Sequence, residues 1–329
     1  MKTGKTLLYL SRADLETIAF PMCDCMDVLE EAHKALASGR VEMPSKPYIG
    51  DPLGEGFLSA YAAKIQTPPQ VGVKWLGGCA GNKAKNLPTF HALIILNDPV
   101  TLCPIAVMDG TYVTGLRTAG VSGATMRHFA NKDSKTVAIL GCGLQGRMHL
   151  RATMAACDGI RRAYVWGPSP ATARRFMDEM KREFELTWIL AEQPEEAVRE
   201  ADIVISSTPI GPPEAFSVLK GEWFRPGVTA ISISRANHFT ADGFAAFDRY
   251  IVDELPTLSL VAERPGFAHC AQIQAAELGA FLLTGEGGRE SREERILCVC
   301  DGIAVNDIAV GTALLHRAME RGIGTELPL

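Results

Sequence analysis

The spacing of apolar positions changes along the chain, and the change separates two styles of structure. Residues 11–39 carry apolar positions at helical spacing, interrupted by Pro21 and followed by Gly39, which predicts two helices. Residues 41–109 instead contain short β-rich runs between Pro, Gly and Asn clusters, which predict a largely antiparallel sheet. These runs are GFLSAYAAKI, VGVKWLG, HALIILND and PIAVMDG.

The second style begins after a helical stretch near residues 112–130. The run SKTVAILGCG starts an alternation of strand-like and helical segments that continues through RRAYVWG, a helix at 170–184, ADIVISSTP, GVTAISIS and DRYIVDE. The last segment, from DGIAVND to GIGTEL, has the pattern of a long amphipathic helix, and periodicity leaves its packing partner open. We therefore expect an α/β protein with a Rossmann doubly wound parallel sheet and a second, β-rich α+β domain.

Composition and charge favour a two-domain protein with a small-molecule ligand. The 329 residues are 47% hydrophobic and 22% charged, enough for a sizeable core at the usual boundary between one and two domains. A formal net charge of −5 provides no basic field for nucleic acid or anionic lipid. No run approaches the roughly 18 apolar residues of a membrane span, and the N-terminal segment turns polar before a secretory signal is complete. We expect a cytoplasmic protein.

The nine cysteines form two C-x-C pairs and no C-x-x-C pair. Cys298 and Cys300 lie in an alternating apolar run, and no companion ligands stand at zinc-binding spacing. We interpret the cysteines as reduced and mostly buried, and we expect no metal site.

A G-x-G-x-x-G pattern follows the strand-like run Thr136–Leu140 and precedes a helix-compatible segment. In that context Gly141 permits the tight turn, Gly143 lets the backbone approach a pyrophosphate, and Gly146 allows close packing of the helix, whose N-terminus attracts phosphate. The alternative is a bare strand-to-helix turn. The context favours a dinucleotide site.

The choice between NAD and NADP depends on the end of the second strand. NAD-preferring sites carry an acidic residue about 20 positions after the glycines. Here Gly167 and Pro168 occupy that region, while Ser169, Arg174 and Arg175 follow and could meet a 2′-phosphate. The alternative is that both arginines are solvated helix charges. We favour NADP(H).

Three cations in the β-rich half are candidates for holding a small carboxylate. Lys74 interrupts an apolar strand, so its side chain either reaches solvent at a sheet edge or points into a cleft. Arg117 precedes a run of small residues and could equally be a surface charge. Lys46 lies in a rigid extended segment between Pro44 and Pro47.

Segments from nearly the whole chain resemble the ornithine cyclodeaminase/μ-crystallin family. They are MPSKPYIG, VGVKW, NLPTFHALIILND, PIAVMDGTYVTGLRTAG, VAILGCGLQG, ADIVISSTP and the C-terminal DGIAVNDIAV and ERGIGTEL. The resemblance implies a homodimer that pairs through the β-rich domain. It also implies a substrate-binding and dimerisation domain at residues 1–117 with 308–329, and an NAD(P)-binding Rossmann domain at residues 118–307.

The resemblance also implies roles for single residues. Arg117 would bind the substrate α-carboxylate, Lys74 would contact the carboxylate or amine and transfer a proton, and Lys46 would contact the carboxylate. Thr89, on the substrate side, and Thr118, on the cofactor side, are further candidates. The remaining cofactor candidates are Gly141, Gly143, Leu144, Gln145, Gly146, Gly167, Ser169, Arg174, Ser207, Thr208 and Pro209.

One departure from the family bears on the reaction. The resemblance implies an aspartate in the cyclodeaminases of the family at a position that an ungapped placement assigns to Ala236, and alanine can neither pair with an ammonium nor accept its proton. A shift of one residue would place Asn237 there, a neutral hydrogen-bond partner but not a base. We therefore expect an NAD(P)-dependent oxidoreductase that transfers a hydride at the C–N carbon of a small α-amino or α-imino acid. The alternatives are a cyclodeaminase, which recycles NAD⁺ while releasing ammonia, and a non-catalytic NADPH-binding protein of the μ-crystallin kind.

Overall fold

The computed structural model describes residues 4–50, 56–208, 218–233, 236–263, 267, 272–300 and 302–329. The chain forms two compact units, Met1–Arg117 with Ile303–Leu329, and Thr118–Gly302. The chain returns to the first unit at Ile303, a few residues before the boundary that we expected at 308, because a long helix of that unit begins at Ala304. Pro209 lies outside the described residues.

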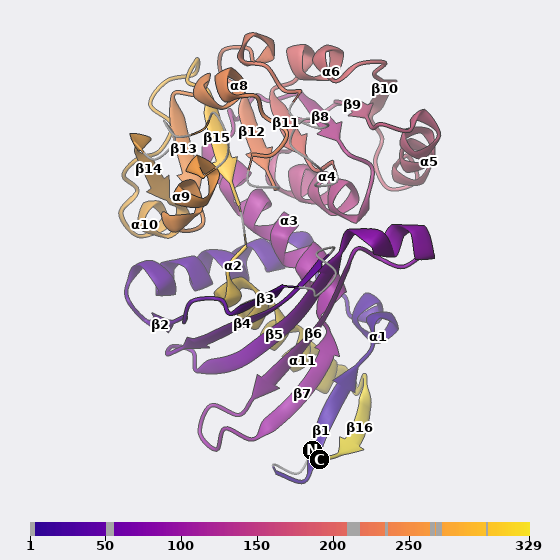
Figure 1. Ribbon diagram of the computed structural model, residues 1–329, viewed down its shortest axis with the longest axis vertical. Coiled ribbons are helices and arrows are strands. Elements are labelled where there is room, and N and C mark those ends of the chain that lie inside the picture. The colour runs from indigo at the N-terminus through magenta and orange to yellow at the C-terminus, as the bar shows by residue number, and fades with distance from the viewer. Residues whose placement is uncertain are drawn as a thin grey trace. The chain divides into compact units, whose positions relative to one another are not determined.

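The first unit is built on an eight-stranded sheet (Figure 1). Its strands follow the order β16-β1-β7-β6-β5-β4-β2, with β3 paired to β4. Every neighbouring pair is antiparallel except β1 with β7. The strands are β1 (Thr6–Leu10), β2 (Val41–Glu42), β3 (Tyr48–Gly50), β4 (Gly56–Ile65), β5 (Gln70–Cys79), β6 (Phe90–Asn97), β7 (Pro104–Asp109) and β16 (Thr325–Pro328).

The helices of this unit begin at residues suited to that role. Ser11 caps α1 (Arg12–Thr17) through a capping box with Asp14, and Pro21 precedes α2 (Met22–Ala37). The amphipathic C-terminal segment is α11 (Ala304–Arg321), which packs against α2 and against β4, β5 and β6. A short 3₁₀ helix, η1 (Ala80–Lys85), follows β5.

A glycine lets α11 approach the sheet closely. A Cβ on Gly72 of β5 would lie 3.0 Å from Ile308 Cδ1 and 2.5 Å from the carbonyl oxygen of Ile95. Any larger side chain at residue 72 would push the helix away from the strand. The close approach brings the first turn of α11 next to the middle of β5.

The opposite face of this sheet, which we call the outer face, is apolar and in large part exposed. Side chains alternate between the two faces of a strand, so Trp75 lies on the face opposite Lys74. Trp75 pairs in register with Ala60 and Leu93, and Trp75 and Leu93 are 42% and 47% exposed. The same face carries Leu58, Val73, Ile95, Val107 and Tyr9.

The second unit is a doubly wound parallel sheet, as the alternating pattern predicts (Figure 1). Its strand order is β10-β9-β8-β11-β12-β15-β13-β14, and every pair is parallel. The strands are β8 (Thr136–Leu140), β9 (Arg162–Trp166), β10 (Thr187–Leu190), β11 (Ile203–Ser206), β12 (Thr229–Ser232), β13 (Arg249–Val252), β14 (Ala275–Glu277) and β15 (Ile296–Val299). The boundary between the units falls within α3 (Gly110–Phe129).

The helices between these strands complete the alternation. They are α4 (Leu144–Ala156), α5 (Pro170–Met180), α6 (Pro194–Glu200), α8 (Ala241–Ala245), α9 (Pro256–Ala262), α10 (Leu278–Thr284) and the 3₁₀ helix η2 (Gly221–Trp223). No helix within the described ranges combines the length and the apolar character needed to cross a bilayer.

The central strands of this sheet are buried at every position. This holds for β8, β11, β12 and β15, because helices cover both faces of a parallel sheet. Cys298 therefore lies in a continuously buried strand, where we expected an alternating one.

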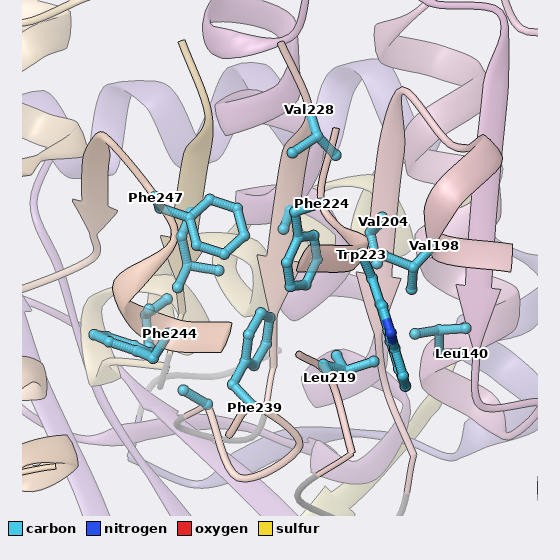
Figure 2. Packing of buried hydrophobic residues seen from close by; sticks show 14 of the residues in the cluster. Leu140, Val198, Val204, Leu219, Trp223, Phe224, Val228, Phe239, Phe244 and Phe247 are labelled. Carbon is cyan, nitrogen blue, oxygen red and sulfur yellow. The ribbon is translucent and has the colours of Figure 1, made fainter. Parts of the chain in front are cut away.

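An aromatic cluster forms part of the core of this unit (Figure 2). Phe224 and Phe239 stack with their ring centroids 5.6 Å apart, and Phe247 packs against both rings. Aromatic rings bury large apolar areas, so this cluster fixes the segments around β12 to the sheet.

Candidate active site

In the first unit Lys74 lies in the middle of β5 and is fully buried. Register places Tyr61 of β4 on one side of it and Ile94 of β6 on the other. The Lys74 ammonium lies 4.5 Å from the centroid of the Tyr61 ring, a cation–π distance. Of the two orientations that the sequence left open, the side chain points inward.

Two further ionisable side chains meet Lys74 there. Lys74 Nζ lies 2.7 Å from Asp307 Oδ2, and Arg117 Nε donates to Asp307 Oδ1 at 3.0 Å. Asp307 is fully buried and Arg117 nearly so. Asp307 comes from the first turn of α11, Arg117 from α3 and Lys74 from β5. One carboxylate thus holds two buried cations, which we call the Lys74–Asp307–Arg117 cluster.

Lys46 approaches the same ring. Its ammonium lies 5.1 Å from the Tyr61 centroid. The segment around Lys46 is held by Ser59 Oγ, which donates to the Pro47 carbonyl at 2.8 Å. The structure therefore brings together all three cations that the sequence singled out.

Burial changes the acid–base behaviour of Lys74. Its pKa is lowered to about 8, chiefly by loss of solvation and also by the positive charges of Arg117 and Lys46, while Asp307 opposes the shift. Proton-transfer groups work best with a pKa near the working pH. Lys74 is therefore suited to give and take a proton near neutral pH.

Thr89 is not part of this cluster. Its side chain is exposed, and its carbonyl accepts from the backbone N–H of Cys79 at the end of β5. At about 3.3 Å per residue, Cys79 lies about 16 Å along the strand from Lys74.

In the second unit Gly141 and Gly143 lie in the loop between β8 and α4, and Gly146 lies in the first turn of α4. A Cβ on Gly141 would lie 2.5 Å from the Ser207 backbone, and one on Gly146 would lie 2.1 Å from the Gly141 carbonyl oxygen. A Cβ on Gly143 would meet nothing within 4 Å. Gly141 and Gly146 thus have packing reasons to be glycine, whereas Gly143 borders open space where a phosphate can approach.

The start of α4 is suited to an anion. Gly143 is the N-cap and offers no side-chain cap, and the first turn contains no acidic residue. The N–H groups of Leu144, Gln145 and Gly146 have no acceptor within the helix, and they lie at the positive end of its dipole. These features fit a dinucleotide pyrophosphate.

The other cofactor candidates of this unit lie around the same loop or at its margins. Ser207 Oγ donates to the carbonyls of Leu140 and Gly141, and Thr208 is buried next to it. Gly167 follows β9, and a Cβ there would lie 3.3 Å from Cys142 Sγ. Thr118 is buried on α3, where its carbonyl accepts from Ser122 Oγ.

The segment after β9 contains no acidic side chain before α5. Ser169 caps α5 by accepting from the Thr172 N–H at 3.4 Å, and Arg174 is exposed on that helix. The Ser169 hydroxyl is therefore already engaged, whereas the Arg174 side chain extends toward solvent.

Ala236, the residue that the ungapped placement assigns to the cyclodeaminase aspartate, has a methyl group as its side chain. Its side chain is fully buried, its φ is +56°, and its N–H donates to Ser232 Oγ at 2.9 Å. Close to it in sequence, His238 Nδ1 lies 2.6 Å from Ser206 Oγ in a buried contact.

Sequence reasoning missed Asp307, Tyr61 and His238. Asp307 had a detectable signal, because an acidic residue stands on the face of the C-terminal helix that the apolar pattern assigns to the core. No feature of the sequence marked Tyr61 as a site residue, since aromatic residues are common in β-rich runs.

The two units together define the class of protein. The second has the doubly wound sheet and glycine loop of the Rossmann class, and the first carries a buried cluster of two cations on one carboxylate. The chain belongs to the ornithine cyclodeaminase/mu-crystallin family, whose model matches residues 7–322.

Full-length relatives include dehydrogenases, reductases and, at 27% identity, an uncharacterized cyclodeaminase of Sinorhizobium fredii. The chain is 31% identical to N-((2S)-2-amino-2-carboxyethyl)-L-glutamate dehydrogenase of Staphylococcus aureus, with 99% of each chain covered. It resembles the structure of Thermococcus litoralis Δ1-pyrroline-2-carboxylate reductase in complex with NADH and L-proline, with a TM-score of 0.89 and 28% identity. The match covers 97% of this chain and 99% of the reductase. It also resembles an archaeal alanine dehydrogenase dimer with bound NAD, with a TM-score of 0.86, 27% identity and coverage of 98% and 99%.

Proposed function

We propose that this protein is an NAD(P)-dependent oxidoreductase acting at the C–N carbon of a small α-amino or α-imino acid. The observation that carries the proposal is the Lys74–Asp307–Arg117 cluster. In it a lysine of lowered pKa and an arginine share one carboxylate and are almost completely buried. The named relatives, which act on amino and imino acids or are described with NAD or NADH bound, support the same reaction class.

The three cations of the first unit would have different roles, because their chemistry differs. Arg117, always charged and planar, suits a carboxylate, and Lys46 adds a second positive charge near Tyr61. Lys74 can hold a proton for the substrate nitrogen because its pKa lies near 8. We leave Thr89 out of the site, because it is exposed and bonds to Cys79, which lies about 16 Å along β5 from Lys74.

The second unit would hold the dinucleotide. Gly141, Gly143, Leu144, Gln145 and Gly146 would bind the pyrophosphate, and Thr118, Ser207 and Thr208 would line the site. A bound nicotinamide would supply or accept the hydride. Between the two dinucleotides we propose NADP(H), because Arg174 is exposed where a 2′-phosphate could reach it and Gly167 replaces an acidic residue.

A substrate panel tests the proposal. The purified protein is mixed with NADPH or NADH and with α-keto acids plus ammonia or an amine, or with cyclic imino acids, and the reduced-nicotinamide absorbance is followed. Net oxidation of the cofactor supports the oxidoreductase. Ammonia release from ornithine or lysine without net absorbance change would support a cyclodeaminase, which Ala236 argues against. Tight dinucleotide binding with no turnover across the panel would support a non-catalytic binder.

The pH dependence should differ between the two directions of the reaction. Imine reduction needs protonated Lys74, so kcat/KM should be level below pH about 8 and fall by about tenfold per pH unit above it. Amine oxidation needs neutral Lys74, so kcat/KM should rise up to pH about 8 and then level off. Steady-state profiles in both directions measure this. Profiles that move in the same direction would exclude Lys74 as the proton-transfer group.

We further propose that the protein is a homodimer joined through the outer face of the first sheet. Monomeric proteins rarely expose contiguous apolar patches of more than a few hundred Å². Here an apolar stripe crosses β4, β5 and β6 at Ala60, Trp75 and Leu93. The dimer described for the archaeal alanine dehydrogenase supports the proposal. A cytoplasmic location remains a prediction.

Leu93→Glu should convert the dimer to a monomer, because a carboxylate at the centre of the apolar stripe would be buried without a partner. Light scattering coupled to size-exclusion chromatography measures the mass. Met319→Glu, at an exposed position of α11, serves as the control and should leave the mass unchanged. A Leu93→Glu protein that stays dimeric would place the interface elsewhere.

A further inference from the structure

We propose that Arg147 is a positioning residue of the glycine loop, holding the loop carbonyls inward so that its N–H groups stay available to the dinucleotide phosphates. The inference rests on the proposed binding of a dinucleotide. Arg147 follows the glycine pattern in the first turns of α4 and takes no part in the glycine motif itself.

The guanidinium of Arg147 contacts two carbonyls of the loop. Its Nη1 donates to the carbonyl of Cys142 at 2.6 Å and to that of Gly143 at 3.1 Å. Ser207 Oγ donates to the two preceding carbonyls, those of Leu140 and Gly141, at 3.3 and 3.1 Å. Side chains therefore engage the carbonyls of four successive residues, 140–143.

The Cys142 carbonyl has a specific importance. In an α-helix the N–H of residue i bonds to the carbonyl of residue i−4, so an extension of α4 would join the Gly146 N–H to Cys142. Arg147 Nη1 fills one of the two acceptor positions of that carbonyl, and α4 begins at Leu144. The Gly146 N–H thus remains among the donors at the helix N-terminus, where a phosphate can accept from it.

The guanidinium is itself fixed from the other side. Arg147 Nε donates to both carboxylate oxygens of Glu179 at 2.9 Å, and Nη2 lies 2.7 Å from Oε2. The Phe176 ring centroid lies 5.4 Å from the guanidinium carbon. Since Glu179 neutralises the charge, Arg147 acts on the loop through geometry more than through net charge.

The same helix offers a matched control one turn further on. Arg151 Nε and Nη2 donate to the two carboxylate oxygens of Glu183 at 2.8 and 2.5 Å, the same type of ion pair that Arg147 makes with Glu179. The Nη1 of Arg151 contacts Met148 Sδ, whereas that of Arg147 contacts the loop. Removing either arginine costs one bidentate ion pair, but only the change at residue 147 releases the carbonyls of Cys142 and Gly143.

The test compares Arg147→Met with Arg151→Met in the full-length protein. Equilibrium titration with NADPH and with NADH, followed by calorimetry, should show a Kd raised about tenfold by Arg147→Met, the effect of losing charge-assisted hydrogen bonds worth about 1.4 kcal/mol. Arg151→Met should change Kd by less than about twofold. Steady-state kinetics should show a raised KM for the dinucleotide and an unchanged KM for the amino or imino acid in Arg147→Met. Arg147→Lys, which keeps one donor to the loop, should lie between wild type and Arg147→Met.

Thermal unfolding without dinucleotide shows whether each methionine variant stays folded at the titration temperature, so that a raised Kd reports a change in the loop and not unfolding. An unchanged Kd in Arg147→Met, or an equal rise in both methionine variants, would overturn the inference while leaving the proposed function intact. A wild-type protein that binds neither dinucleotide would overturn the proposed function and this inference with it.

Discussion

Lys74→Met is expected to lower kcat/KM by about a thousandfold while leaving the Kd for the dinucleotide unchanged. General acid–base catalysis contributes roughly 10²–10⁴-fold to a rate, and Lys74 is the residue in the cluster whose pKa suits proton transfer. Methionine fills a similar volume without charge, and the variant should fold because Asp307 is not left as an unpaired buried charge. Arg117 remains as a partner for Asp307.

The measurement combines steady-state kinetics with dinucleotide titration of the same preparation. Lys64→Met serves as the control, because Lys64 lies on the neighbouring strand β4 and forms an exposed ion pair with Glu42 at 2.9 Å. Exposed pairs contribute about 0–1 kcal/mol, so this variant should retain full activity. If Lys74→Met turned over at a rate close to wild type, the buried lysine would have a structural role alone and the proposed mechanism would be wrong.

Asp307→Asn is expected to damage both stability and proton transfer. Breaking a buried ion pair by removing one partner costs about 3–5 kcal/mol, because the remaining charge stays buried without compensation. Here two cations, Lys74 and Arg117, lose the same carboxylate. The free energy of unfolding from denaturant titration should fall by about that amount.

The kinetic consequence of Asp307→Asn has a definite sign. Asp307 raises the pKa of Lys74 against the effect of burial, so its loss should lower that pKa below about 8. The fall of kcat/KM for imine reduction should then begin at a lower pH than in the wild type. Asp24→Asn is the control, since Asp24 forms a partly exposed pair with Arg317 on the same unit. A stable Asp307→Asn protein with an unshifted pH profile would contradict the role of Asp307.

Much of the architecture could be predicted from local pattern. Alternation of strand-like and helical segments predicted the parallel sheet, because covering helices make its strands uniformly apolar. Six short strands, β1, β2, β3, β10, β14 and β16, were not predicted. Runs of two to five residues are too short for periodicity to identify, and pairing with a neighbouring strand stabilises them.

The glycine loop shows which residues a sequence motif can identify and which it cannot. Spacing and context identified Gly141, Gly143 and Gly146, since each answers a local backbone requirement. The role proposed for Arg147 could not be inferred in the same way. Its partners are the carbonyls of the loop and a glutamate 32 residues away, and only the packing of α4 against α5 brings that glutamate within reach.

The sequence by itself determined the two kinds of sheet, the position of the glycine loop and the identity of the three cations, because periodicity and backbone requirements are recorded within a few neighbouring residues. The tertiary structure decided how those cations are used. Lys74 points inward because strand register sets it beside Tyr61, and Asp307 reaches Arg117 across a separation of 190 residues. That contact depends on Gly72, whose missing side chain lets α11 lie close to β5. Partners so distant are selected by register and close packing, which no local pattern along the chain encodes.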